Sequence, residues 1–364
     1  MPGVQVNGHK VNGHGLNGHS VVPTAAALTK RLGLHYVAAE TLTIGRRRCG
    51  KGWTYRHADG RVIRDHATLQ RLARLAVPPA YDSVLYAEDP AAHLQAIGRD
   101  AAGRLQYRYH PEWEKVREER KARRLGRLAQ VLPRIRRSLG QHLAGDVPTR
   151  ESALAAVIEL VACSAIRPGS ESYARLRGTR GAATMLKSNV TLDGETITLS
   201  FRAKGGKQVV KEFSSARLCK AIECLRQLPG RRLFQYRADN GDVRHVTAQE
   251  VNGFLREIAD VKISLKDFRT LLASASVLET LARATPAASG RKRRKQVLEA
   301  VRAAAADLSN TPAICRKSYV NQSVVAAFED GVLERFSAAL AACRSPARRT
   351  EVLAKIVAEA ATEV

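Results

Sequence analysis

The order of apolar and polar positions divides the chain into a part with short strands and a longer, mainly helical part. Between about residues 34 and 109, short apolar runs alternate with Gly and Asp, and Asp59-Gly60 is a strong β-hairpin signal. From about 112 to 142, apolar residues recur at helical intervals, and Pro133 is expected to break or kink that helix. Residues 153–165 are almost all apolar, which predicts a buried helix.

The second half of the chain adds one small sheet to a helical pattern. Residues 189–213 predict a three-stranded antiparallel meander, with turns at Asp193-Gly194 and at 204–207. Residues 214–260 predict helices with interruptions, and more helices are expected up to the C-terminus. The expected fold class is α+β: a small antiparallel β-rich N-terminal lobe (33–110) and a larger, mainly α-helical domain (111–364) that contains the meander.

Residues 1–32 are expected to form a flexible tail. The triplet Asn-Gly-His occurs there three times at intervals of five residues, between positions 7 and 19. Histidine repeats can chelate a metal, but no carboxylate or Cys ligands accompany these. A flexible Gly-rich leader is therefore the favoured interpretation, and no metal site is predicted.

Charge changes the picture more than any single motif. The 364 residues include 60 Lys and Arg against 34 Asp and Glu, a formal net charge of +26 that is spread along the chain. This excess indicates a polyanionic partner, most plausibly nucleic acid. No apolar stretch has the length of a membrane span, and the N-terminus lacks the order of a signal peptide. The six cysteines form no C-x-x-C pair, which disfavours zinc and redox motifs and suggests a reducing cytoplasm.

Two stretches of the N-terminal lobe are candidate DNA contacts. Residues 45–53 place four cations beside three glycines, which let a backbone approach a phosphate closely; the alternative is a solvated hairpin tip. Residues 106–110 alternate polar and aromatic side chains, as on the two faces of a strand; the alternative is an ordinary strand with its aromatics inward. The predicted contacts here are Arg46, Arg47, Arg48, Lys51, Arg104, Gln106, Tyr107 and Tyr109.

Four cationic residues in three segments of the larger domain suggest a reactive site. Arg167 directly follows the buried helix and is held by Pro and Gly, although an exposed Arg at a helix end would also fit. Lys204 lies on a Gly-rich hairpin, where a solvated turn lysine is the usual outcome. Lys266 and Arg269 are three residues apart at a helix start, and Asp267 could instead pair with Arg269.

Tyr319 is the candidate nucleophile. Thr311 can cap a helix with Pro312 at its first position, which places Tyr319 about two turns along. Arg316 and Lys317 make this helix cationic, so the hydroxyl could attack a DNA phosphate. The alternative is a helix tyrosine that packs on the core.

The order and spacing of these segments resemble the type IB DNA topoisomerases, specifically the bacterial and poxvirus-like branch. The resemblance spans about residues 34–335, and its strongest pieces are 93–110, 166–169, 266–270 and 310–319. It implies that Tyr319 is the nucleophile, that Arg167 and Arg269 hold the scissile phosphate, and that Lys204 is the general acid. Asn310 occupies the position nine residues before the tyrosine, where poxvirus-like members have His. The resemblance also implies DNA contacts near Tyr173, and we add Lys266 to this set.

The implied function is relaxation of supercoiled double-stranded DNA. One strand is cut through a 3′-phosphotyrosine, the duplex rotates, and the strand is resealed without ATP, a cofactor or an obligatory metal; no P-loop is present. The expected form is a cytoplasmic monomer that acts as a clamp on nucleoid DNA. A tyrosine recombinase is one alternative, although Lys266 stands where such enzymes usually carry the first residue of a His-x-x-Arg box. A non-catalytic DNA-binding or nucleoid protein is the other.

Overall fold

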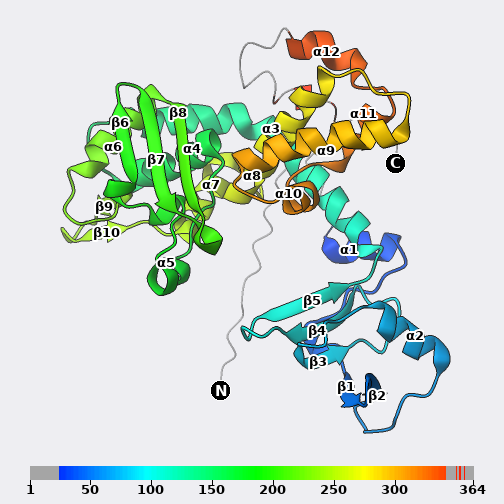
Figure 1. Ribbon diagram of the computed structural model, residues 1–364. Coiled ribbons are helices and arrows are strands. Elements are labelled where there is room, and N and C mark those ends of the chain that lie inside the picture. Colours follow the sequence, from blue (N-terminus) through cyan, green and yellow to red (C-terminus); the bar gives the residue numbers. More distant parts are fainter. Residues whose placement is uncertain (1–23, 342–349, 351, 354–355, 357–364) are drawn as a thin grey trace, which may run out of the picture. The chain divides into compact units, whose positions relative to one another are not determined.

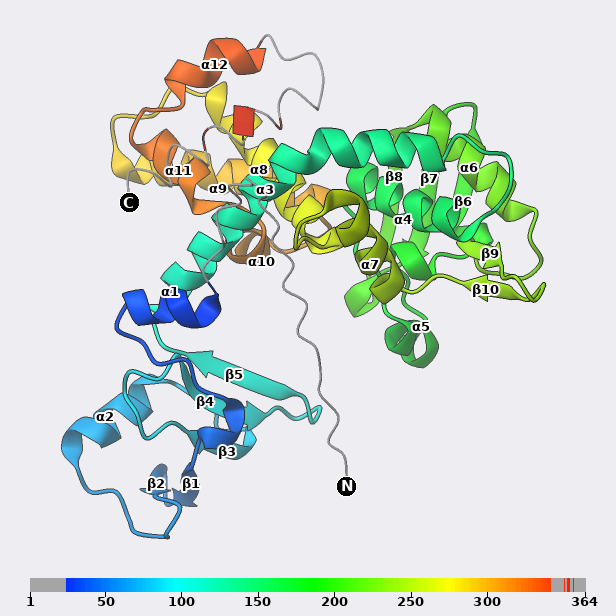
Figure 2. The same cartoon turned by 180° about the vertical axis from the view of Figure 1, so that it is seen from behind.

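The computed structural model describes residues 24–341, 350, 352–353 and 356. Figure 1 shows the chain coloured along its sequence, and Figure 2 shows it from behind. The chain divides into two compact units, Met1–Val116 and Arg117–Val364. The Asn-Gly-His repeats lie outside the described residues.

The first unit is built on one antiparallel sheet of five strands in the order β2-β1-β3-β4-β5. Ile44, Tyr86 and Ala96 point into its core and pack with Leu72. The unit also contains α1, which lies in the segment assigned to the tail and buries Leu28. The elements are α1 (Ala25–Arg31), η1 (Ala39–Thr41), β1 (Ile44–Cys49), β2 (Gly52–Arg56), α2 (His66–Arg74), β3 (Asp82–Tyr86), β4 (Leu94–Arg99) and β5 (Leu105–Tyr109).

The second unit is mainly helical. Its three-stranded meander has the order β6-β7-β8, and a two-stranded hairpin, β9-β10, lies between two helices in the sequence. The 3-10 turns are η2 (Ala182–Thr184), η3 (Lys187–Asn189) and η4 (Lys204–Gly206), and the strands are β6 (Val190–Asp193), β7 (Thr196–Arg202), β8 (Gln208–Ser214), β9 (Gln235–Arg237) and β10 (Val243–His245). The helices are α3 (Trp113–His142, which begins in the first unit), α4 (Arg150–Ser164), α5 (Glu171–Arg177), α6 (Ala216–Arg226), α7 (Ala248–Ala259), α8 (Leu265–Ala282), α9 (Gly290–Asp307), α10 (Pro312–Ser318), α11 (Gln322–Glu329) and α12 (Glu334–Ala341).

Helix α4 is the centre of the second unit. It begins at the cap Thr149, whose hydroxyl accepts a hydrogen bond from the Ser152 backbone, and nearly all of its side chains are buried. It contacts α6, α7, α8 and β8 (Figure 1). A helix that is apolar on every side can be stable only when neighbours enclose it, which makes its C-terminal end a rigid support for the residues that follow.

The structure confirms the α+β class and the antiparallel meander. Three local expectations were wrong. Helix α2 forms within the segment read as β-rich, capped by Asp65 and anchored by the buried Leu72. Residues 235–245 form the β9-β10 hairpin, not helix. Helix α3 also continues through Pro133, so of the expected break or kink the break does not occur. The buried neighbours Leu132 and Ile135 hold both sides of the proline in the core.

Candidate active site

Arg167 is positioned by the end of α4 and by a glycine-rich contact. Ala165 ends the helix in a left-handed conformation, with φ of 54°. The carbonyl of Arg167 then accepts a hydrogen bond from the Ala182 backbone at 2.8 Å. A Cβ atom at Gly181 would lie only 2.6 Å from that same carbonyl, so only glycine fits at this approach. The guanidinium Nη2 of Arg167 donates to Oδ1 of Asn310.

Arg269 is the most deeply buried cation of the site, with 1% of its surface exposed. Its two terminal nitrogens donate to the backbone carbonyls of Ala165 and Leu308, the latter at 3.2 Å. Its guanidinium carbon lies 4.9 Å from the centre of the Tyr319 ring. Burial lowers the pKa of Arg269 and Tyr319 opposes that shift, but an arginine stays charged in proteins. A charge fixed in this way needs no reorganisation when a phosphate arrives.

Asp267 does not pair with Arg269, which was the alternative raised by the sequence. Its Oδ2 accepts hydrogen bonds from Arg124 on α3 at 2.6 Å and from the backbone and hydroxyl of Ser264 at 2.8 and 3.0 Å. The carboxylate therefore caps the start of α8 and is fully engaged there. Arg269 keeps its positive charge uncompensated by this neighbour.

Asn310 and Tyr319 flank the short helix α10. Ser309 has a positive φ of 51° and turns the chain after α9, so that Asn310 meets Arg167. Among the described residues, Nδ2 of Asn310 is buried and has no hydrogen-bond partner. Thr311 caps α10 as expected, but the helix ends at Ser318 and Tyr319 is its C-cap residue. Its carbonyl accepts a hydrogen bond from Ser274 at 3.1 Å, which fixes the backbone of the candidate nucleophile.

Lys204 lies in the turn between β7 and β8. Gly205 and Gly206 both have positive φ there, which explains the paired glycines. Lys204 is exposed, and within the described part of the chain its side chain makes no hydrogen bond or ion pair. A lysine on such a turn can follow a ligand that enters the site.

One cavity of about 430 Å³ brings Arg167, Lys204, Arg269 and Tyr319 together, whereas Asn310 reaches this site through its hydrogen bond with Arg167. No carboxylate lines it among the residues described, so its cations face one another without compensation. The Tyr319 ring also lies 5.9 Å from the ammonium of Lys266. Arg180, which the sequence analysis did not select, belongs to the same wall. Its only signal in the sequence is its place in Gly178-Thr179-Arg180-Gly181, a cation close to two glycines. The lining residues are Arg167, Pro168, Gly169, Ser170, Tyr173, Thr179, Arg180, Lys204, Lys266, Arg269 and Tyr319.

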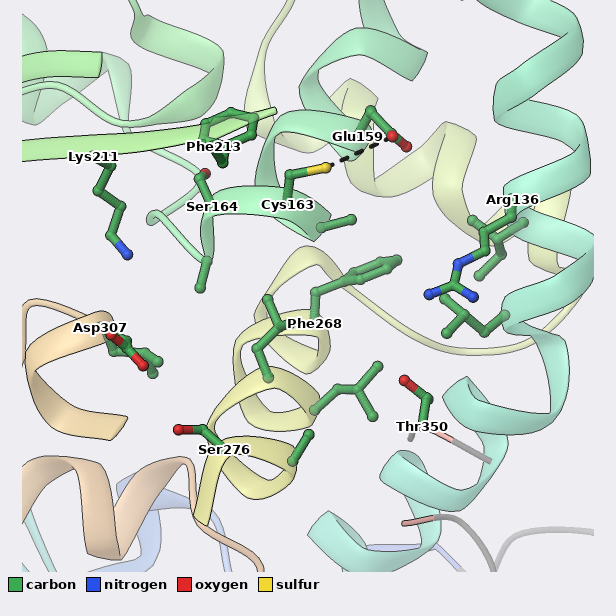
Figure 3. Close-up of a pocket in the computed structure, with 18 of the residues that line it drawn as sticks. Arg136, Glu159, Cys163, Ser164, Lys211, Phe213, Phe268, Ser276, Asp307 and Thr350 are labelled. Carbon is green, nitrogen blue, oxygen red and sulfur yellow. Dashed lines mark hydrogen bonds between the residues drawn. The ribbon is translucent and has the colours of Figure 1, made fainter. Parts of the chain in front are cut away.

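A larger cavity of about 620 Å³ lies in the same unit but has a different character (Figure 3). Its walls are mainly apolar, and neither Tyr319 nor Lys204 lines it. The Cys163 thiol donates to the Glu159 carboxylate at 3.7 Å, as the dashed line in Figure 3 shows. Desolvation of the thiol, with this carboxylate, raises the pKa of Cys163 to about 12. Size alone therefore does not identify the reactive cavity.

The cations of the first unit fall into two kinds. Arg47, Arg48 and Lys51 are exposed around the β1-β2 turn. Arg46 instead donates to the carbonyls of Val77, Pro78 and Tyr81, and its guanidinium lies 4.0 Å from the centre of the Trp53 ring. These contacts give Arg46 a structural part within the unit.

Strand β5 presents its aromatic side chains outward. Tyr107 and Tyr109 are 46% and 40% exposed, and their rings stack with centroids 6.1 Å apart. The alternative that the aromatics of this strand point inward is therefore wrong. Arg104 and Gln106 both donate to the carboxylate of Asp100, and the Arg104 contact holds the pKa of Asp100 down at about 2. These residues form a polar and aromatic surface on one strand.

The family profile described as "Eukaryotic DNA topoisomerase I, catalytic core" matches residues 110–341. The profile "Bacterial DNA topoisomerase IB, N-terminal domain" matches residues 52–100. A DNA topoisomerase 1B of Acanthamoeba polyphaga mimivirus is 28% identical over 284 residues, which cover 76% of this chain and 84% of the relative.

The helical unit and its cationic tyrosine pocket fit a class of enzymes that cut DNA by transesterification to a tyrosine. Because the catalytic-core profile matches well over half of the chain, the chain belongs to the type IB DNA topoisomerases. These relax supercoiled DNA by transient cleavage of one strand, rotation and religation. The tyrosine-recombinase and nucleoid-protein alternatives are not favoured. No helix in the described part of the chain combines the length and apolar content that a membrane crossing requires.

Proposed function

We propose that Tyr319 is the nucleophile of strand cleavage in this enzyme. The observation that carries the proposal is the cavity that Tyr319 lines together with Arg167, Lys204 and Arg269, with no acid among the described residues of its wall. Attack of the phenol oxygen at phosphorus forms a 3′-phosphotyrosyl bond and releases the 5′-oxygen of the downstream strand. The cations of the cavity stabilise the negative charge that builds on the phosphate oxygens during this attack.

Arg167, Arg269 and Asn310 are proposed to hold the nonbridging oxygens of the scissile phosphate. Two donors support this assignment: Nδ2 of Asn310 and Nε of Arg269 are buried without a partner among the described residues. An unsatisfied buried donor costs about 1–3 kcal/mol, which a phosphate oxygen would recover on binding. Arginine suits this task because its forked donors never deprotonate, whereas Asn310 can donate but cannot titrate near neutral pH.

Lys204 is proposed to protonate the departing 5′-oxygen. An alkoxide is a poor leaving group, so a proton donor at this atom lowers the barrier to cleavage. In religation the same lysine accepts the proton from the 5′-hydroxyl as that oxygen attacks the phosphotyrosine. The bond exchanged is a phosphodiester in both directions, so its energy is conserved and no ATP is needed.

The first unit is proposed to increase the affinity for duplex DNA through Arg47, Arg48, Lys51 and the aromatic side chains of β5. Exposed cations neutralise backbone phosphates, and tyrosines contact sugar and phosphate without reading sequence. We further propose that the enzyme acts as a monomeric clamp on nucleoid DNA in the cytoplasm.

The direct test is relaxation of negatively supercoiled plasmid in EDTA without ATP. We expect relaxation and a covalent DNA adduct with the wild type, neither with Tyr319→Phe, and both with Tyr236→Phe, a partly buried tyrosine outside the cavity. If the wild type loses relaxation activity only when EDTA is present, the proposed independence of a metal is rejected. Retained adduct in Tyr319→Phe would reject the nucleophile.

A further inference from the structure

Among the described residues, two cations line the active-site cavity without a part in the mechanism above, Lys266 and Arg180. Arg180 is the one that the sequence did not single out. It lies in the loop after α5 and is partly buried. It also lines a narrow neighbouring cavity together with Arg167 and Arg269. Arg180 therefore lines two adjoining cavities, each together with Arg167 and Arg269.

The backbone around Arg180 is tied to both halves of the proposed phosphate site. Its own N–H donates to the carbonyl of Arg202 at 2.7 Å, two residues before Lys204. The next residues, Ala182 and Ala183, donate to the carbonyls of Arg167 and Pro168, each at 2.8 Å. The backbone around Arg180 is thus hydrogen-bonded both to the loop of Arg167 and to β7, the strand that leads to Lys204. These bonds fix the backbone from which the Arg180 side chain extends.

The charge of Arg180 is not balanced by a close partner. Within the described residues its guanidinium makes no hydrogen bond or ion pair. Glu171 is the acid that acts on it, but Oε2 of Glu171 accepts a hydrogen bond from Arg232. Burial lowers the pKa of Arg180, Arg232 and Arg231 add to this and Glu171 opposes it; the side chain nevertheless stays charged. A partly desolvated, uncompensated arginine is an anion site.

We propose that Arg180 contacts a phosphate of the cleaved strand inside the active-site cavity, between the positions served by Arg167 and Lys204. This inference rests on the proposed function, because it takes the cavity around Tyr319 as the place of cleavage. Arg180 then contributes to transition-state stabilisation if its phosphate is the scissile one, and to holding the strand in register if it is the adjacent one.

The test is single-turnover cleavage of a duplex oligonucleotide whose cleavage site has first been mapped by trapping the covalent adduct. We expect Arg180→Gln to slow cleavage about 10- to 100-fold, the usual size of a lost charged hydrogen bond. Arg180→Lys should retain part of the rate, since it keeps the charge but loses the fork. Arg283→Gln is the matched control, because this arginine is 75% exposed at the far end of α8 and pairs with Glu279.

A set of duplexes with one neutral methylphosphonate each then identifies the contact. At the phosphate that Arg180 contacts, wild type and Arg180→Gln should cleave at the same rate, because the interaction is already absent from the substrate. Thermal melting of every variant separates a folding defect from a lost contact.

The outcomes distinguish the Arg180 contact from the proposed function of the cavity. If Arg180→Gln cleaves like the wild type, or if its deficit persists at every neutralised phosphate, Arg180 is not a phosphate contact. That failure leaves the proposed function intact as long as the wild type forms a Tyr319-dependent adduct. Absence of the adduct in the wild type would instead remove the proposed function itself.

Discussion

The cations of the β1-β2 turn and those of the active-site cavity are the same kinds of residue in opposite environments. Arg47, Arg48 and Lys51 are exposed on the first unit. Arg269 in the second unit is 1% exposed, and backbone carbonyls fix both of its terminal nitrogens. Water and salt screen the first group, whereas the second keeps its field in a poorly solvated site.

Positive charge therefore serves two separate purposes in this chain. Exposed cations release counterions when they meet a phosphate, which supplies affinity that depends strongly on salt. Buried, fixed cations are aimed before the substrate arrives, so they can favour the transition state over the ground state. The comparison predicts that substitutions in the cavity change the rate of cleavage, while substitutions at the turn change the affinity for DNA.

Arg269→Gln should show the largest effect. Loss of one preorganised donor to the phosphate is expected to slow single-turnover cleavage by about 10²–10³-fold. Glutamine also leaves the carbonyls of Ala165 and Leu308 less well satisfied, so the melting temperature should fall. Quenched cleavage time courses and thermal melts measure the two effects separately. Cleavage within twofold of the wild type in a folded variant would contradict the role given to Arg269.

Lys204→Ala should come next, with a loss of about 10²-fold in cleavage, the lower end of what general acid catalysis contributes. The loss should nearly vanish on a substrate whose 5′-bridging oxygen is replaced by sulfur, because a thiolate leaves without a proton. Lys207→Ala is the matched control on the same turn, exposed as Lys204 is but outside the cavity. An equal deficit on both substrates would show that Lys204 acts by some means other than proton donation.

The triple change of Arg47, Arg48 and Lys51 to Gln should mainly weaken binding. The slope of log affinity against log salt is expected to fall by about 0.9 for each phosphate contact removed. Cleavage at saturating DNA should stay near the wild-type rate. Fluorescence anisotropy across a salt series measures the slope, and an unchanged slope would place these side chains away from the backbone.

Arg46→Gln should have the smallest effect on DNA and a measurable effect on folding. Its guanidinium serves the carbonyls of Val77, Pro78 and Tyr81, and leaving buried acceptors unpaired costs about 1–3 kcal/mol. Denaturant unfolding should report this loss, while the salt slope of binding should match the wild type. A reduced slope with unchanged stability would return Arg46 to the DNA-contacting group.

Sequence patterns were most reliable where local chemistry decides the structure. The meander was predictable because Asp193-Gly194 and the glycines of the second turn supply the positive φ values that tight turns need. The apolar run in α4 could only be a buried helix or strand, and its length selected a helix. The resemblance to type IB topoisomerases, carried by the spacing of Arg167, Arg269 and Tyr319, was confirmed at the level of the family.

Other elements were not predictable because their stability comes from distant parts of the chain. Helix α2 is only nine residues long, and its one buried side chain, Leu72, packs in the core of the sheet. The strands β9 and β10 are three residues each and too short to show alternation. Pro133 stays within α3 because the surrounding core outweighs one lost hydrogen bond.

The α+β class, the strong positive charge and the family could be predicted from the sequence, because they follow from composition, periodicity and motif order. Only the tertiary structure decided which cations share a cavity. Arg167 and Asn310 are 143 positions apart and are joined by a hydrogen bond. Arg46 and Arg47 are adjacent, yet one is bonded internally and the other is exposed. Burial and partnership depend on contacts between remote segments, which a single chain's local pattern does not encode.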